Sequence, residues 1–169
     1  MLAWARNSTL YRLSRRMMTQ RELTDAVRRK AKQKFEDISE VQLEAVATAA
    51  IEFGQQIGAL DDRAYAHTKV RSSVRGGRSK RMIGRKLQEK GVQQEIVVEA
   101  LEGADDFRAA VAYARKRGFG PFRRAPMDEK RLVRELSSFA RNGFSLELGR
   151  RILDMELTEA EDALAAHPL

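Results

Sequence analysis

Residues 60–92, LDDRAYAHTKVRSSVRGGRSKRMIGRKLQEKGV, contain two short helical patterns on either side of a glycine pair. Asp61 or Asp62 caps the first helix, because a side-chain carboxylate accepts hydrogen bonds from the free N–H groups of a helix start. Gly76-Gly77 breaks that helix, and Ser79 caps the second one. Gly91 ends the second helix in the left-handed conformation that glycine adopts readily.

The same stretch is strongly basic. Between Arg63 and Lys90 it holds ten Lys or Arg residues and one acid, Glu89, which amounts to +9. The whole chain of 169 residues carries only +8, so the rest of the protein is slightly acidic. Such exclusion of acids is not typical of an evenly solvated surface, and it indicates contact with a polyanion or an acidic protein groove.

Helical spacing continues on the N-terminal side of this stretch. Ser8 is expected to cap a short first helix with an apolar stripe of leucine and methionine. Two capping boxes follow, Thr19 with Glu22 and Ser39 with Gln42, and each predicts the start of a longer helix. The second of these helices carries one continuous apolar stripe, and Gly58 ends it.

Helical spacing also continues on the C-terminal side. Asp105 or Asp106 caps a further helix, and Ser145 caps the last one. The link FGPFRRAP is not helical, since a proline pushes the preceding residue out of the helical region. From Thr158 onward the sequence is acidic and rich in alanine, and we expect it to fray.

The chain is therefore predicted to be all-α, with about nine helices in three units of three. Strand signals, such as alternating runs of β-branched residues, are almost missing. Each unit holds too few apolar residues for a large core, so the units are expected to stack into an elongated, curved repeat molecule. The predicted boundaries are repeat 1 at 1–60, basic repeat 2 at 61–104, repeat 3 at 105–157 and a frayed tail at 158–169.

Two patterns support a repeat. Lys90-Gly91-Val92 and Asn142-Gly143-Phe144 lie 52 residues apart, with apolar positions matched around them. Charge also alternates in phase with the helix triplets, giving +8 in 6–34, −7 in 35–62, +9 in 63–90, −5 in 91–107, +7 in 108–134 and −4 in 135–169. The early helices of each unit are thus basic and the last is acidic.

Composition excludes several classes of protein. Cysteine is absent, which rules out disulfides and thiolate metal sites. No apolar run approaches the roughly 20 residues of a membrane span. The arginine-containing, acid-free N-terminus resembles a transit peptide, but a basic first helix explains it better because a capped helix follows directly. We expect a cytoplasmic monomer.

No catalytic constellation emerges from the residues. The two histidines are His67, on a basic helix, and His167, in the tail. Asp61-Asp62 has the chemistry for Mg²⁺, although a helix cap is the better interpretation because Asp105-Asp106 repeats it. GGRSKR lacks the spacing of a phosphate loop. We therefore expect no enzyme activity, metal or cofactor.

Binding to nucleic acid fits the residues better. The basic helices suit phosphate contacts, whereas few Asn, Gln or Ser side chains accompany them for reading bases. Accessible aromatic candidates for stacking on single strands are Tyr65, Tyr113, Phe119 and Phe122. The other aromatic residues at helical spacing, Phe53, Phe107 and Phe139, are assigned to the core.

The central stretch also resembles the RecX family of bacterial recombination regulators. The resemblance rests on the Asp-Asp-capped helix, the basic glycine turn and the helix ending in Lys-Gly-Val, followed by QEIVVEAL, YARKRGFGPFR and ARNGFSLELGRRIL. It covers about residues 11–153, and the first repeat departs most from the family pattern. It implies three-helix repeats that bind the RecA filament on single-stranded DNA along its groove and lower its ATPase, strand-exchange and coprotease activities, without a cofactor.

The residues expected to touch the filament or its DNA fall in the matching segments. They are Lys69, Arg71, Arg75, Arg78, Lys80, Arg81, Arg85 and Lys86 in the central segment, and Arg115, Lys116, Arg117, Arg123 and Arg124 in the third unit. An alternative stays open at this point, namely a helical protein that binds bare DNA or RNA nonspecifically.

Overall fold

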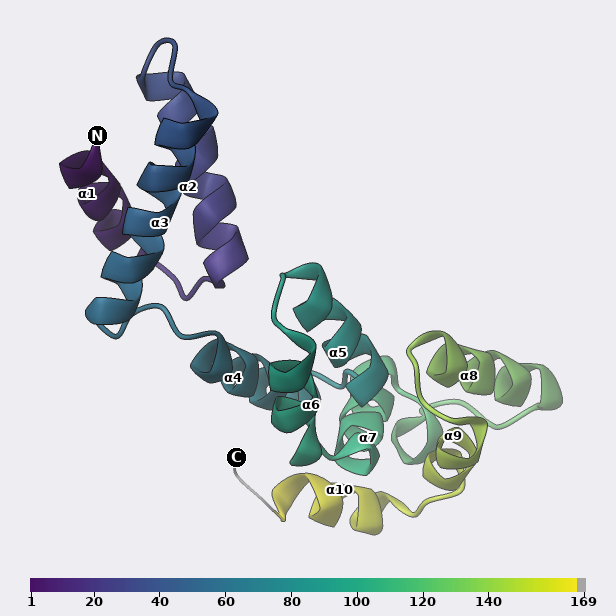
Figure 1. Cartoon of the computed structure of the whole chain (residues 1–169). Helices are drawn as coiled ribbons and strands as arrows, with labels where there is room; N and C mark the ends of the chain where they lie inside the picture. Colours follow the sequence, from purple (N-terminus) through teal and green to yellow (C-terminus); the bar gives the residue numbers. More distant parts are fainter. Residues whose placement is uncertain (167–169) are drawn as a thin grey trace. The chain divides into compact units, whose positions relative to one another are not determined.

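The structure, a computed structural model, describes residues 1–166 and is entirely helical (Figure 1). Ten α-helices and one 3-10 turn occur in that range, and no strand does, which confirms the predicted all-α class. The elements are α1 (Leu2–Leu13), α2 (Gln20–Lys34), α3 (Glu40–Gln56), α4 (Asp62–Arg75), α5 (Lys80–Glu89), α6 (Gln94–Glu102), α7 (Asp106–Arg117), η1 (Gly120–Phe122), α8 (Glu129–Arg141), α9 (Leu146–Leu153) and α10 (Leu157–Ala165). His167 lies outside the described residues.

The chain divides into two compact units. The N-terminal unit comprises Met1–Ala66 and Leu87–Val97, and the C-terminal unit comprises His67–Lys86 and Val98–Leu169. The boundaries of the three predicted repeats stay a prediction, because this division by compactness does not test them.

In the N-terminal unit, α3 packs on both α1 and α2 and lies between them (Figure 1). Its core is made of apolar side chains at helical spacing, because one stripe of each helix is removed from water. The buried members are Ala5, Leu23, Val27, Ala31, Leu43, Val46, Ala50 and Leu60. At the margin, the rings of Trp4 and Phe35 meet edge to face at 5.3 Å.

Both predicted capping boxes are present, whereas the predicted start of the first helix is wrong. The Thr19 and Ser39 side chains each accept a backbone N–H three residues on, and Glu22 and Gln42 reciprocate. Ser8, expected as a cap, lies inside α1, where its hydroxyl accepts from Arg12. Burial of Ala5 and Thr9 extends the packed face back to Leu2, and tertiary packing outweighs the local capping preference.

In each of the two Asp-Asp pairs, the two carboxylates accept hydrogen bonds from different helices. Asp61 and Asp105 are the caps of α4 and α7, since each carboxylate accepts two N–H groups of its own helix. The second acid of each pair reaches another helix instead. Asp62 accepts the Gln20 N–H at 2.9 Å, at the start of α2, and Asp106 accepts the Lys80 N–H at 2.6 Å, at the start of α5.

A hydroxyl completes the connection on each side. Thr19, the cap of α2, donates to the Lys90 carbonyl at 2.7 Å, and Ser79, the cap of α5, donates to the Asn142 carbonyl at 2.7 Å. Both hydroxyl residues are fully buried. Each set of a hydroxyl, a second aspartate and a glycine turn is called a joint below. The N-terminal joint is Thr19, Gln20, Asp62, Lys90 and Gly91, and the C-terminal joint is Ser79, Lys80, Asp106, Asn142 and Gly143.

The glycines of the joints have no room for a side chain. Gly91 and Gly143 have φ values of +79° and +84°, a region that other residues rarely adopt. A Cβ atom on Gly143 would lie 2.5 Å from the Ser79 hydroxyl oxygen, and one on Gly91 would lie 2.6 Å from the Arg21 Cβ. The 52-residue offset between these turns therefore marks one structural device used twice.

Charged groups surround the N-terminal joint. Glu22 accepts from Lys90 at 2.6 Å and from the Thr19 N–H at 3.2 Å. Burial alone raises the pKa of Glu22, but these hydrogen bonds outweigh desolvation and hold the pKa below its ordinary value. Burial raises the pKa of Asp62, and the hydrogen bond from Gln20 works against that rise.

In the C-terminal unit the core centres on α7 and an aromatic cluster. All side chains from Ala109 to Ala114 are buried. The rings of Tyr113, Phe119, Phe139 and Phe144 lie 5.4–6.2 Å apart in edge-to-face and tilted contacts. The core assignment of Phe139 is confirmed, whereas Phe53 and Phe107 are only half-buried.

The expectation that the tail frays from Thr158 onward is wrong for the described residues. Leu157–Ala165 form α10, which packs on α7. Ala160 is fully buried there, and Arg108 of α7 donates to the Leu164 carbonyl at 3.1 Å. Alanine has high helix propensity, and its small side chain allows close approach to α7. The net charge of the tail reflects neither property.

We predict that Gly143→Ala destabilises the protein more than Gly118→Ala. Gly118 also has a positive φ, +65°, but its Cβ would meet nothing closer than 3.8 Å, so this variant measures only the left-handed backbone cost of about 1–2 kcal/mol. The clash with Ser79 adds at least about 1 kcal/mol. Urea unfolding followed by circular dichroism measures the free energy of unfolding of both variants. Equal losses of stability would contradict the close contact between Gly143 and Ser79.

A second prediction concerns pH. Because the folded pKa of Glu22 is lowered, its stabilising contribution is present above the ordinary glutamate pKa of 4.5 and is lost as pH falls through the folded pKa. Lys90 stays charged throughout this window, because Glu22 raises its pKa further. Lys90→Gln should therefore cost about 1 kcal/mol or less at pH 7, since Lys90 is partly exposed, and almost nothing well below pH 4.5.

Denaturant unfolding across this pH range checks the prediction. Arg6→Gln is the control, because it removes one exposed positive charge from the same unit without touching Glu22. A difference between wild type and Lys90→Gln that does not change with pH would show that the ion pair is not its source.

Candidate phosphate-binding site

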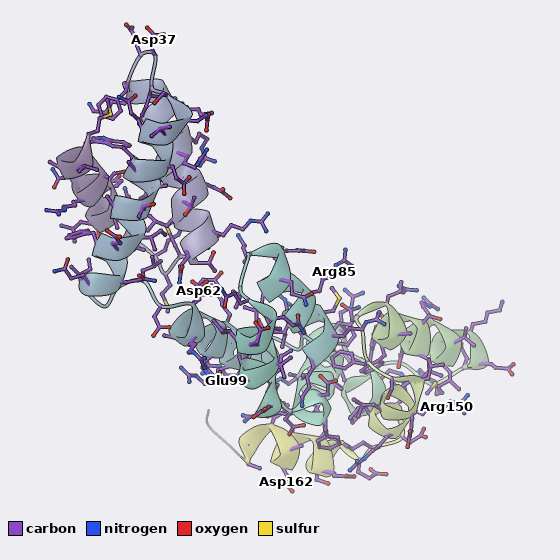
Figure 2. The ribbon with its side chains drawn as sticks, viewed as in Figure 1. Asp37, Asp62, Arg85, Glu99, Arg150 and Asp162 are labelled. Atoms are coloured by element: carbon purple, nitrogen blue, oxygen red, sulfur yellow. The ribbon has the colours of Figure 1, made fainter. Side chains whose placement is uncertain are left out.

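All thirteen basic residues expected at the interface belong to the C-terminal unit. Lys69, Arg71 and Arg75 lie on α4, Arg78 lies in the glycine turn, and Lys80, Arg81, Arg85 and Lys86 lie on α5; Arg115, Lys116 and Arg117 end α7, and Arg123 and Arg124 follow η1. Eleven are exposed, while Lys80 and Arg123 are half-buried. Figure 2 shows Arg85 on α5.

Three of these residues converge on one hollow of about 340 Å³. They are Arg78, Lys116 and Arg117, and a fourth cation, Arg141 at the end of α8, joins them. The rest of the lining is Gly76, Gly77, Tyr113, Ser138 and Asn142. We call this site the basic hollow.

The basic hollow is strongly cationic. Its lining, which lies entirely within the described residues, includes four positive side chains and no acid. A concave surface lined by one sign of charge focuses the field and raises the local concentration of the opposite ion. Lysine and arginine donors in such a place suit a phosphate group or a carboxylate.

A hydrogen-bonded network forms the polar part of the wall. The Tyr113 and Ser138 hydroxyls are 2.8 Å apart, and the Asn142 amide donates to the Tyr113 hydroxyl at 2.7 Å and to the Ser138 carbonyl at 2.9 Å. Tyr113 is only 8% exposed, so its ring belongs to the aromatic core. The expectation that Tyr113 and Tyr65 are accessible for stacking is therefore wrong, since Tyr65 is equally buried.

The glycine turn holds Arg78 at the edge of this network. Gly77 has φ +76°, and a Cβ there would lie 2.7 Å from the Tyr113 backbone nitrogen. The turn thus lies directly against α7, which brings Arg78 close to the last turn of that helix. A larger residue at Gly77 would push the turn away from α7 and so separate Arg78 from Lys116, which lie 38 residues apart in the sequence.

Arg123 has a structural role instead. It donates twice to Glu135 of α8, at 3.0 and 2.7 Å, and Glu135 also accepts the Gly120 N–H at 3.2 Å. The side chains of Arg123 and Glu135 are only 11% and 4% exposed. A guanidinium committed to a buried carboxylate is not available to a partner, so we exclude Arg123 from the proposed interface.

The remaining basic residues lie outside the basic hollow. Lys80 contributes its backbone N–H to the C-terminal joint. Arg71 borders a separate, largely apolar groove of about 350 Å³ together with Val70, Val74 and Phe107. The other expected cations of α4 and α5 are exposed and do not line the basic hollow.

Sequence reasoning missed Arg141. It lies in the acidic block 135–169, so counting charge by block concealed it. The signal that points to it is the 52-residue offset, which pairs the Asn142-Gly143 turn with Lys90-Gly91 and so places the end of α8 beside the C-terminal joint.

Other chemistry is limited in the described part of the chain. His67 lies 3.7 Å from Glu99, and both side chains are 44% exposed. Residues 1–166 contain no group of three or more His, Asp or Glu side chains arranged to hold a metal ion. Among the same residues, no helix is both long enough and apolar enough to span a bilayer.

Comparison with known proteins identifies the family. The sequence pattern described as "RecX, second three-helix domain" matches residues 61–101. Over 169 residues the chain is 54% identical to Regulatory protein RecX of Agrobacterium fabrum (strain C58), and the match covers 100% of this chain and 92% of that protein. The chain belongs to the RecX family.

Other RecX proteins agree. The Regulatory protein RecX of Thermobifida fusca is 32% identical over 163 residues, covering 94% of this chain and 81% of that protein. The crystal structure of RecX from Lactobacillus salivarius matches with a TM-score of 0.67 at 20% identity and covers 95% of this chain and 96% of that chain, so the fold is shared. The resemblance to RecX seen in the sequence is confirmed.

We predict that Arg123→Met destabilises the protein by about 3 kcal/mol, because it leaves the buried Glu135 carboxylate without its charged partner. Arg124→Met is the matched control, since Arg124 is the exposed neighbour, and it should change stability by less than about 0.5 kcal/mol. Thermal unfolding distinguishes the two, and similar melting temperatures for both variants would place Arg123 among the binding residues again.

Proposed function

We propose that this RecX protein binds the RecA filament on single-stranded DNA along its groove and lowers its ATPase, recombinase and coprotease activities, as a cytoplasmic protein without a catalytic reaction of its own. The observation that carries the proposal is the basic hollow, in which Arg78, Lys116 and Arg141 come together from three separate segments. The relatives named regulatory proteins support a regulatory role rather than an enzymatic one.

The hollow fits a phosphate of the filament's DNA. Its donors are charged side chains on helix ends and on a tight turn held by Gly77. Because this backbone is already ordered, binding costs little conformational entropy of the backbone. The exposed cations of α4 and α5 supply further contacts to the DNA backbone. Many modest contacts on one chain add through effective concentration, and occupation of the groove excludes an incoming duplex sterically.

The alternative function is nonspecific binding to bare DNA or RNA. The same cations favour it, because each phosphate contact releases counterions whatever the sequence. The two functions differ in what the protein recognises. A filament modulator acts on RecA at concentrations well below those that saturate free DNA, whereas a nonspecific binder follows the total amount of polyanion.

The deciding experiment combines three charge reversals in the hollow, Arg78→Glu, Lys116→Glu and Arg141→Glu. We expect the RecA ATPase on single-stranded DNA to require at least about tenfold more of this variant for half-inhibition, since two or three phosphate contacts are lost. Binding to bare single-stranded DNA is measured in parallel by fluorescence anisotropy over a series of salt concentrations.

The control carries the same change of charge on exposed residues of the same unit that do not line the hollow, Lys130→Glu, Arg134→Glu and Arg150→Glu (Arg150 is labelled in Figure 2). It should inhibit nearly as well as the wild type. An equal loss in both variants would reduce the effect to net charge. Normal inhibition by the hollow variant would remove the hollow from the interface, and no effect of the wild type on RecA would favour the nonspecific binder.

A further inference from the structure

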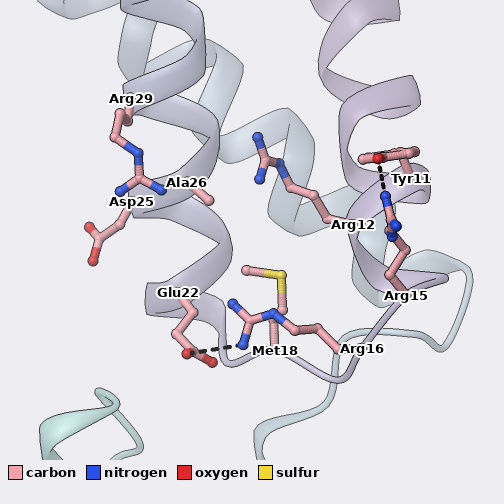
Figure 3. A pocket seen from close by; sticks show the side chains of 9 residues that line it. All are labelled: Tyr11, Arg12, Arg15, Arg16, Met18, Glu22, Asp25, Ala26 and Arg29. Atoms are coloured by element: carbon pink, nitrogen blue, oxygen red, sulfur yellow. Dashed lines mark hydrogen bonds and ion pairs between the residues drawn. The ribbon is translucent and has the colours of Figure 1, made fainter.

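The N-terminal unit contains a second cationic hollow, of about 440 Å³, between the end of α1, the following link and the first turns of α2 (Figure 3). It is lined by Tyr11, Arg12, Arg15, Arg16, Met18, Glu22, Asp25, Ala26 and Arg29. None of the thirteen expected interface residues belongs to it. We call it the arginine pocket.

Guanidinium groups come from both sides of the arginine pocket. Arg12 and Arg16 extend from the α1 side toward α2, and Arg29 lies on α2 (Figure 3). Arg12 donates through Nε to Ser8 at 3.3 Å, which leaves its two terminal amino groups without a bond in that contact. The guanidinium fork matches the geometry of a phosphate, to which it donates two parallel hydrogen bonds.

The acids of the arginine pocket do not cancel its charge. Four arginines face two carboxylates, and Glu22 is already bound to Lys90 at 2.6 Å and to the Thr19 N–H at 3.2 Å. The contact between Arg16 and Glu22 is longer, at 3.6 Å, and the Arg16 side chain is 62% exposed. An anion that enters the pocket therefore meets arginines without displacing the main partners of Glu22.

Tyr11 adds a planar surface beside these charges. Its side chain is 61% exposed, although a tyrosine usually buries most of its ring. The Arg15 guanidinium lies 5.0 Å from the ring centroid and also donates to the Tyr11 hydroxyl, so the ring is held in place. Of the four aromatic residues expected to be accessible, Tyr65 and Tyr113 are buried and Phe119 and Phe122 are half-buried. Tyr11 was not among them and is exposed.

We propose that the arginine pocket binds a nucleotide of single-stranded nucleic acid, with its phosphate held by Arg12 and Arg16 and its base stacked on Tyr11. A nucleotide base has a planar face that can stack on Tyr11, and its phosphate lies a few bonds away. The carboxylates of an acidic peptide would bind the arginines but would not stack on the ring. The site goes beyond the proposed function, because it lies in the N-terminal unit and adds stacking of a base on Tyr11 to the phosphate contacts proposed for the basic hollow.

The experiment uses the full chain carrying the three charge reversals in the basic hollow, so that the remaining DNA binding reports on the arginine pocket. The probe is a fluorescein-labelled oligothymidylate, with 5-iododeoxyuridine at one position for photo-crosslinking. We expect the cross-linked peptide to contain Tyr11. Tyr11→Ala should weaken binding about five- to a hundredfold, whereas Tyr11→Phe, which keeps the ring, should bind like its parent.

Two further variants isolate the charges. Arg12→Glu should weaken binding at least about tenfold, while Arg6→Glu, with the same change of charge on an exposed position of the same helix, should have little effect. Circular dichroism confirms that each variant is folded. The exposure of Tyr11 makes its replacement tolerable for the fold.

Three results would overturn the proposal. Cross-links confined to other peptides would place the strand elsewhere, and unchanged binding by folded Tyr11→Ala would exclude stacking. Displacement of the oligonucleotide by poly-glutamate at equal charge concentration, unaffected by Tyr11→Ala, would identify the pocket as a site for acidic peptides. Each result is independent of whether the wild type inhibits RecA, so this proposal and the proposed function fail separately.

Discussion

Two buried hydroxyls, those of Thr19 and Ser79, each hold a helix start and a glycine turn together. The oxygen accepts a backbone N–H of its own helix, and the proton goes to the carbonyl before the glycine. A buried backbone group without a partner costs about 1–3 kcal/mol. These few hydrogen bonds therefore fix the position of each glycine turn against the start of its partner helix. The close approach of the turns leaves room only for glycine at 91 and 143. The second aspartate of each pair accepts the N–H of the residue after the hydroxyl, Gln20 or Lys80.

The basic side chains of the C-terminal unit differ in their surroundings. Arg123 and Arg124 are neighbours in the sequence, yet one is sealed against Glu135 and the other is exposed. In the basic hollow, by contrast, the charges gather around a hydrogen-bonded wall of Tyr113, Ser138 and Asn142. Arg123 therefore has a structural partner because a buried acid lies within its reach, whereas no acid lines the basic hollow.

The sequence predicted the helical class, both capping boxes and most helix ends, because these depend on residues close together in the chain. It left open which aspartate of each pair is the cap, since the answer lies in the N–H groups of Gln20 and Lys80, 42 and 26 residues away. It misjudged Ser8 and the tail, where packing of Ala5 and Ala160 outweighs local signals. It predicted Arg78, Lys116 and Arg117 as interface residues but not Arg141. The net charge of a sequence block does not show which single residues come together in space.

The edge-to-face pair of Trp4 and Phe35 has a practical consequence. The chain contains a single tryptophan, and it lies in the N-terminal unit beside α2 and α3. Its intrinsic emission senses the environment of that unit alone, whereas far-ultraviolet dichroism averages over every helix. Comparing the two optical signals in one denaturant titration would reveal whether the two halves of the molecule melt as one cooperative block or in separate stages.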